Sequence, residues 1–176
     1  MTLEITAEPE RETIEEQLNV KITRQVPISL HPFKEYFKGF EKVEAVRRIF
    51  GDKTEDVLNN LKVEFAGTRG YMGVNPVDGH VLMGANYLKN GDFVDIYLDI
   101  IHELVHVRQF MEGKELFDDN FSYIDRPTEL EAYRHTVEEA RRIGLTDAKI
   151  LRYLKTEWMT SKDVKSLAGA LNIKCQ

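Results

Sequence analysis

The chain has 176 residues, a length that suits one domain and is short for two. Hydrophobic residues make up 42% of it and charged residues 31%, a balance typical of a protein with a sizeable core and a water-facing surface. The formal net charge of −6 argues against a general nucleic-acid binder, which normally presents a basic face, so we expect no nucleic-acid partner.

Three features bear on the compartment. The single cysteine, Cys175, allows no disulfide within the chain, so nothing requires an oxidising environment. The first residues soon turn acidic and lack the basic start and apolar run of a secretory signal. The apolar stretch at residues 93–107 is interrupted by charged residues, so we expect no membrane span. Together these features predict a cytoplasmic protein.

The N-terminal part predicts short elements. An acidic helix is expected near residues 14–20, followed by a loop or short extended segment between Pro27 and Pro32. Apolar residues then recur at helical spacing on both sides of Gly39, namely Phe33, Tyr36, Phe37, Phe40, Val43, Val46 and Phe50. We interpret this stripe as core rather than as a ligand box, and Gly51-Asp52 as the end of the helix.

A small sheet is predicted next, after a short helix that runs to Leu61 with Thr54 as a candidate cap. Three short strands are expected in succession, at residues 63–66, 71–74 and 80–85. Gly67 and Gly70 separate the first two strands, and residues 75–79 (N-P-V-D-G) have the composition of a hairpin turn. The pattern predicts an antiparallel or mixed sheet.

Two longer helices follow the sheet. The first has Asp92 as a candidate N-cap and ends before Gly113. A polar loop leads to the second, which has Asp125 as a possible cap, Pro127 in its first turn and an end near Gly144.

Two further helices are predicted to begin at residues 145–147 and 160–163. Their apolar residues are expected to pack under the preceding helices, and these are Ile150, Leu151, Leu154, Trp158, Val164, Leu167 and Leu171. We therefore expect residues 1–176 to form one α+β domain. Its parts would be an N-terminal subregion (1–52), a central core (60–144) and C-terminal helices (145–176).

The chemistry is concentrated in residues 102–106, which read H-E-L-V-H. On a helix, His102 and His106 lie one turn apart on the same face, so both imidazoles can reach one ion. Zinc takes imidazole nitrogen at about 2.0–2.1 Å, which this spacing can supply. Glu103 is offset by one residue, so it can contact water on the metal without being a ligand.

The helix that carries this pattern is apolar over most of its circumference and should be largely buried. Its polar residues fall together on the remaining sector, and they are Asp95, Asp99, His102, Glu103, His106 and Gln109. Burying such a stripe is costly unless the groups are paired or bind a cation. Arg108 departs from the pattern and is expected to reach solvent or a partner.

A third ligand is expected from the second helix, where Glu129 and Glu131 compete. Glu129 projects onto the apolar face of that helix, and a carboxylate aimed into a core requires a strong partner such as a metal ion. Glu131 projects to the opposite side together with Arg134 and is adequately explained as a solvated surface charge. We therefore predict Glu129 as the ligand.

H-E-L-V-H, followed 23 positions later by Glu129 within E-L-E-A, resembles the gluzincin class of zinc metallopeptidases, especially its small members. The resemblance covers roughly residues 61–143. It implies a zincin-like fold, in which a small sheet packs on the buried helix. It also implies Zn²⁺ held by His102, His106 and Glu129, with Glu103 as general base in the hydrolysis of a peptide or protein substrate. A third-histidine layout does not fit, because Glu112 stands where that histidine would be.

The same resemblance leaves the surroundings of the ligands open. Some gluzincins have an aspartate four residues after the ligand glutamate that supports a histidine, but this chain has Tyr133 there. Asp95 or Asp99 is expected to orient His102 in its place. The resemblance also implies an edge strand that pairs with an extended peptide, and residues 80–86 are the best candidate.

Hydrolysis of a peptide bond passes through a tetrahedral oxyanion, which needs a hydrogen-bond donor opposite the metal. The candidates for this donor are Tyr123, Tyr133 and His135. We favour Tyr123 as a catalytic residue, because His135 should face solvent on the predicted helix. The alternative function is a non-catalytic, zinc-stabilised binding or regulatory module on a peptidase scaffold, although that module would not need Glu103. A latent enzyme, with Cys175 capping the metal from the C-terminal tail, is a further alternative. The sequence does not indicate an oligomeric state.

Overall fold

The structure is a computed structural model that describes residues 13–67 and 71–175. The first residues, on which the prediction of no secretory signal rests, and Gly70 lie outside these ranges. Within them the chain is α+β, as predicted: helices dominate, and two small sheets accompany them. No helix of these two ranges combines the length and the apolar character needed to cross a bilayer.

The N-terminal part is a succession of short elements, with η marking 3-10 turns. They are α1 (Ile14–Leu18), β1 (Lys21–Ile22), β2 (Leu30–Pro32), α2 (Phe33–Tyr36), β3 (Phe37–Lys38), η1 (Phe40–Lys42), α3 (Glu44–Phe50), η2 (Gly51–Lys53) and α4 (Thr54–Asn60). β1 and β3 pair antiparallel. The acidic helix and the helix end at Gly51 are confirmed.

The aromatic stripe is core, as predicted, but it does not lie on one helix. Phe33, Phe37 and Phe40 are at most 1% exposed and their rings contact one another. α2 ends at Tyr36, β3 follows, and the chain turns into η1 at Gly39, which has φ +88°. A Cβ there would lie 2.5 Å from the Asn19 carbonyl oxygen, so only glycine fits where the two segments cross.

Thr54 does not cap α4, contrary to the prediction. It is the first residue of the helix, and its hydroxyl donates a hydrogen bond to the Gly51 carbonyl oxygen at 2.6 Å. The hydroxyl therefore stabilises the preceding 3-10 turn and does not accept a hydrogen bond from an amide of α4.

The main sheet contains β4 (Lys62–Ala66), β5 (Met72–Val74) and β6 (Val81–Gly84), with β2 added at one side. The strand order is β2-β4-β6-β5. The sheet is mixed, because β4 and β6 pair parallel and the other two pairs are antiparallel. β6 pairs parallel with β4 and antiparallel with β5, so it is central and the prediction of an edge strand at residues 80–86 is wrong. The turn at residues 75–79 folds β5 back onto β6, and β5 becomes an edge of the described sheet.

α6 (Phe93–Met111) begins as predicted, because the Asp92 carboxylate accepts hydrogen bonds from the amides of Val94 and Asp95. Gly113 follows its end with φ +76°. A short helix that the sequence analysis did not predict, α5 (Ala85–Asn90), connects β6 to α6. Arg24 donates hydrogen bonds to carbonyls of this connection, at Leu88 and Gly91.

The C-terminal part consists of η3 (Tyr123–Asp125), α7 (Pro127–Arg142), α8 (Asp147–Leu154) and α9 (Ser161–Ala170). Pro127 opens α7 as predicted, but Asp125 does not cap it, because its carboxylate accepts from the Ser122 hydroxyl instead. The starts of α8 and α9 are confirmed, with Thr146 and Thr160 as side-chain caps.

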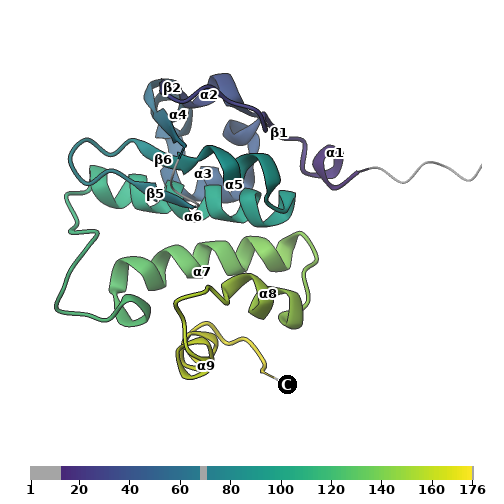
Figure 1. Cartoon of the computed structure of the whole chain (residues 1–176), viewed down its shortest axis with the longest axis vertical. Coiled ribbons are helices and arrows are strands. Elements are labelled where there is room, and N and C mark those ends of the chain that lie inside the picture. The colour runs from purple at the N-terminus through teal and green to yellow at the C-terminus, as the bar shows by residue number, and fades with distance from the viewer. Residues whose placement is uncertain (1–12, 68–70, 176) are drawn as a thin grey trace, which may run out of the picture.

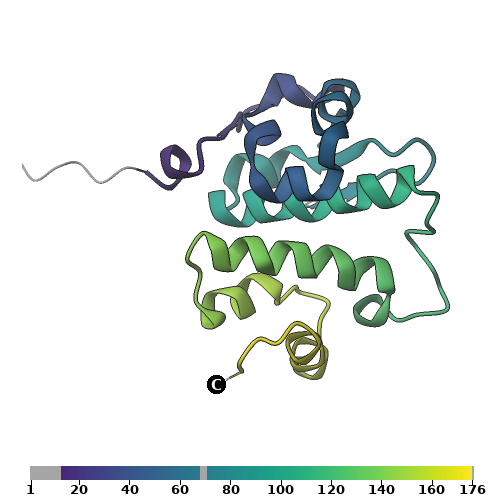
Figure 2. The same ribbon diagram turned by 180° about the vertical axis from the view of Figure 1, so that it is seen from behind.

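The elements form layers around α6 (Figures 1 and 2). The main sheet and α3 pack against α6 on one side, α7 runs along its other side, and α8 and α9 lie beyond α7. The predicted packing of the C-terminal helices is confirmed for Ile150, Leu154, Leu167 and Leu171, which are at most 5% exposed. Trp158 is different, because it is 54% exposed.

Candidate metal centre

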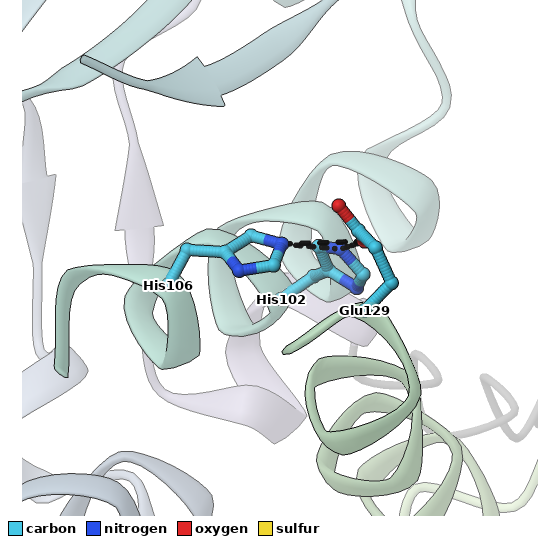
Figure 3. A group of neighbouring side chains, drawn as sticks. All are labelled: His102, His106 and Glu129. Atoms are coloured by element: carbon cyan, nitrogen blue, oxygen red, sulfur yellow. Dashed lines mark hydrogen bonds and ion pairs between the residues drawn. The ribbon is translucent and has the colours of Figure 1, made fainter. Parts of the chain in front are cut away.

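Three side chains from two helices converge at the centre of the molecule (Figure 3). His102 and His106 come from the middle of α6, and Glu129 comes from the first turn of α7. Glu129 Oε2 lies 3.0 Å from His102 Nε2 and 3.3 Å from His106 Nε2, and the two Nε2 atoms lie 3.1 Å apart. One ligand atom from each residue falls within 4.8 Å of the others, so the group could hold a metal ion.

Burying His102, His106 and Glu129 together costs free energy unless their charges are paired or bind a cation. Each of the three residues is 6% exposed. Burial favours the neutral ring of His106, but the hydrogen bond that the ring donates to Glu129 and the charges of Glu103 and Glu129 outweigh it and raise the His106 pKa to about 9. Burial likewise opposes the charge of Glu129, yet its hydrogen bonds to both histidines hold its pKa below the ordinary value.

The Glu131 side chain is directed away from this group. It is 34% exposed and accepts hydrogen bonds from the Arg108 guanidinium at 2.5 Å and from the Gln109 amide at 2.9 Å. Arg108, which had no place in the polar sector, therefore pairs with a carboxylate on the next helix. The sequence analysis preferred Glu129 over Glu131 because Glu129 faces the buried side of α7, and the structure brings Glu129, not Glu131, to the histidines.

The group opens into a cavity of about 430 Å³. The polar sector of α6 forms one wall, and Asp95, Asp99, His102, Glu103 and His106 all line the cavity, as does Glu129. The edge strand β5 forms another wall, and Trp158, from the α8–α9 connection, lies at its rim. The Trp158 ring packs edge-on against Tyr71 at 5.5 Å and against Tyr123 at 6.2 Å.

Glu103 faces this cavity beside the histidines. Its carboxylate makes no hydrogen bond or ion pair with any residue that the structure describes. Burial raises its pKa above the ordinary glutamate value, and the nearby charges of His106 and His102 only partly oppose this. A carboxylate of this kind is available to exchange a proton with a group bound in the cavity.

Of the three candidates for an oxyanion donor, Tyr123 and Tyr133 line the cavity and His135 does not. The hydroxyls of the two tyrosines are 2.8 Å apart, and the Tyr133 ring lies 4.5 Å from the His102 ring. Burial raises the pKa of both phenols, so they remain protonated and can donate. His135 is half-buried in a separate surface hollow beside Glu138.

The expected support of His102 by Asp95 or Asp99 is wrong. Asp99 accepts hydrogen bonds from the hydroxyls of Tyr87 and Tyr153 instead, the second at 2.6 Å. His102 Nδ1 is buried and has no hydrogen-bond partner among the described residues.

His106, in contrast, has a partner that the sequence analysis did not identify. Its Nδ1 lies 2.7 Å from Oε1 of Gln109, one turn further along α6. The signal was present in the sequence, because Gln109 falls on the same polar sector as the histidines. Cys175 is exposed and does not line the cavity, so the structure gives no support to a thiol cap.

Comparison of the chain with known protein families, with curated proteins and with solved structures finds no match. The chemistry of the site therefore has to be argued from its own residues.

Proposed function

We propose that this protein is a zinc-dependent metallopeptidase with a zincin-like arrangement of sheet, α6 and α7. The observation that carries the proposal is the convergence of His102, His106 and Glu129 within 4.8 Å, buried but facing a cavity that also contains Glu103. We further propose a cytoplasmic location, in keeping with a chain whose one cysteine is unpaired.

Zinc suits this donor set better than Mg²⁺ or Ca²⁺ does. Imidazole nitrogen with one carboxylate is a usual zinc environment, whereas Mg²⁺ and Ca²⁺ prefer oxygen ligands throughout. Three protein ligands leave a fourth position for water or substrate, as in catalytic rather than structural zinc sites. A zinc ion held there would lower the pKa of bound water towards about 7 and would polarise a substrate carbonyl.

Glu103 is the general base of this proposal. Its carboxylate faces the cavity without a competing partner among the described residues, so it is free to accept a proton from water. A carboxyl group whose pKa is raised by burial holds that proton more readily than an exposed one and can pass it to the leaving amine. Tyr123, which lines the cavity, is the proposed donor to the oxyanion.

The substrate we propose is an extended peptide paired with β5. An edge strand presents unpaired backbone groups, and an extended peptide can add to it as a further strand. β5 takes this role in place of β6, because it forms the edge of the described sheet and its three residues, Met72, Gly73 and Val74, line the cavity. Pairing there would lay a peptide alongside the histidines.

The alternative, a non-catalytic zinc-stabilised module, requires a closed site with four protein ligands. Among the described residues only His102, His106 and Glu129 form a metal-binding group, and they open into the cavity. The open arrangement therefore favours catalysis.

The test is the substitution Glu103→Gln. Zinc content, measured after dialysis, should stay at one ion per chain, while cleavage of an unstructured protein such as casein should fall by about 10²–10⁴-fold. Glu112→Gln, which changes an exposed glutamate at the end of α6, is the matched control and should cleave normally. Full cleavage by the Glu103→Gln protein would refute the assignment of the base.

A further inference from the structure

Gln109 is a fully buried polar residue that the proposed chemistry does not use. It lies on α6 one turn after His106 and is 0% exposed. Its side-chain amide makes three hydrogen bonds: Oε1 with His106 Nδ1 at 2.7 Å, and Nε2 with the Thr128 carbonyl oxygen at 3.0 Å and with Glu131 Oε1 at 2.9 Å. An amide offers two donors and two acceptor positions, so this one is nearly saturated.

Only one orientation of the Gln109 side-chain amide satisfies all three hydrogen bonds. The Thr128 carbonyl and the Glu131 carboxylate are acceptors, so the NH₂ end of the Gln109 amide has to face them. The amide oxygen is therefore the end that faces His106. An oxygen acceptor needs a donor opposite, which places a proton on His106 Nδ1.

A proton on Nδ1 has a direct consequence for the metal group. In the neutral ring of His106 the free lone pair then resides on Nε2, the nitrogen that lies 3.1 Å from His102 Nε2 and 3.3 Å from Glu129 Oε2. The same hydrogen bond fixes the rotation of the ring. Gln109 thus prepares His106 to bind a metal through the nitrogen that already faces the other two ligands.

Gln109 also connects the two helices that carry the ligands. Thr128, whose carbonyl it binds, immediately precedes Glu129 in the first turn of α7. A displacement of α7 along α6 would therefore break this hydrogen bond as it moved the Glu129 carboxylate. His102 has no comparable support, because its Nδ1 finds no hydrogen-bond partner in the described part of the chain.

We propose that Gln109 is the positioning residue of the metal centre: it fixes the tautomer of His106 and holds the start of α7 in register with α6. This inference rests on the proposed metal site. It predicts that zinc affinity depends on the hydrogen-bond acceptor that residue 109 offers to His106, beyond any effect of this residue on folding.

The experiment compares Gln109→Leu, which removes the acceptor at similar size, with the double variant Gln109→Glu/Glu131→Gln, which keeps the acceptor and avoids two facing carboxylates. Zinc affinity is measured by competition with a chromogenic chelator, and the geometry by the visible absorption of the Co²⁺-substituted protein. Gln109→Leu should bind zinc about 10–100-fold more weakly and show an altered Co²⁺ spectrum. The double variant should bind zinc more tightly than Gln109→Leu, since the acceptor to His106 is kept, and more weakly than the wild type, since the hydrogen bond to the Thr128 carbonyl is lost.

Glu131→Gln is the matched control, because it changes the other polar partner of the Gln109 amide while leaving an oxygen to accept from it. Its zinc affinity should equal that of the wild type. Unfolding of each metal-free variant in urea separates a loss of fold from a loss of affinity.

A second measurement does not depend on the folding of any variant. In the zinc-loaded wild-type protein labelled with ¹⁵N-histidine, NMR should show His106 protonated at Nδ1 and bound through Nε2. Equal zinc affinity in Gln109→Leu and wild type, an affinity of the double variant no higher than that of Gln109→Leu, or a His106 bound through Nδ1 would each overturn the positioning role alone. A wild-type protein that takes up no zinc would overturn the metal site itself and this inference with it.

Discussion

The two sides of α6 are built in different ways. Most of its circumference is apolar and fully buried, as at Ile96, Leu98 and Ile101, where many similar contacts share the stabilisation. The cavity side carries a few polar groups, several of which have a specific partner, such as His106 with Gln109 and Asp99 with two tyrosine hydroxyls. Apolar contacts tolerate exchange between similar side chains, whereas a histidine or carboxylate in the metal group has no substitute. The first side should therefore control stability, and the second should control metal binding.

The largest expected effect lies on the cavity side. Glu129→Ala removes one of three ligands and should abolish zinc retention after dialysis, a larger loss than the 10–100-fold typical of residues outside the ligand shell, about 1.4–2.7 kcal/mol. Glu131→Ala should retain zinc. Retention is measured by elemental analysis, and metal loss in Glu131→Ala alone would reverse the ligand assignment.

The apolar side is tested by Phe40→Ala. Phe40 is 0% exposed and its ring contacts Phe33, Phe37 and Tyr97, so truncation should lower the free energy of unfolding by about 3–5 kcal/mol. Urea denaturation of the metal-free protein gives this value. The fraction that stays folded should bind zinc like the wild type, and a parallel loss of zinc affinity would show that the two sides are not independent.

A smaller effect is expected at the polar contact that α6 makes away from the cavity. The Tyr97 hydroxyl donates a hydrogen bond at 2.6 Å to Glu139, a carboxylate that is 2% exposed and also pairs with Arg142. Tyr97→Phe removes one hydrogen bond to a charged group and should cost about 1.5–3 kcal/mol in urea unfolding, without change in zinc affinity. A stability equal to wild type would mean that Arg142 alone satisfies Glu139.

The smallest effect concerns the pH dependence of stability. Burial and the charges of Asp92 and Asp99 raise the pKa of Asp95 to about 6. The folded-state pKa lies above the ordinary value of 3.8, so the contribution of Asp95 is full below that pH and is lost as the pH rises through about 6. Asp95→Asn should therefore stabilise the protein at about pH 8, by less than about 1 kcal/mol because the group is half exposed, and less so at about pH 4.5.

Urea unfolding at the two pH values measures this difference. Glu115→Gln, a substitution of an exposed glutamate outside the cavity, is the control for loss of a negative charge. If Asp95→Asn destabilised the protein at the higher pH, the Asp95 charge would be favourable in the folded state, contrary to the raised pKa.

Sequence reasoning succeeded where the physical signal is local. Asp92 and Thr160 cap helices through hydrogen bonds to amides two or three residues away, so the residues that define each start are adjacent in the chain. Glu129 was identifiable because a carboxylate on the apolar face of a helix needs a buried partner. The convergence of the two histidines likewise follows from helical spacing alone.

Apart from the caps at Thr54 and Asp125, the errors arose where a distant segment of the chain determines the structure. β6 is central because β4 and β5 both pair with it, and the order of strands is not encoded in any one strand. The need for glycine at the turn of residue 39 comes from the approach of Asn19, twenty residues earlier in the chain. The partners of Gln109 lie on α7, so its place in the polar sector of α6 indicated burial but not what it binds.

Trp158 gives the molecule a built-in optical reporter. It is the one tryptophan in the sequence, it stands at the rim of the cavity, and its ring contacts Tyr71 and Tyr123. Its fluorescence comes from a single place, so a spectral shift on mixing would report what enters the cavity, with no dye attached. Real-time kinetics of occupancy can therefore be followed on the unmodified chain.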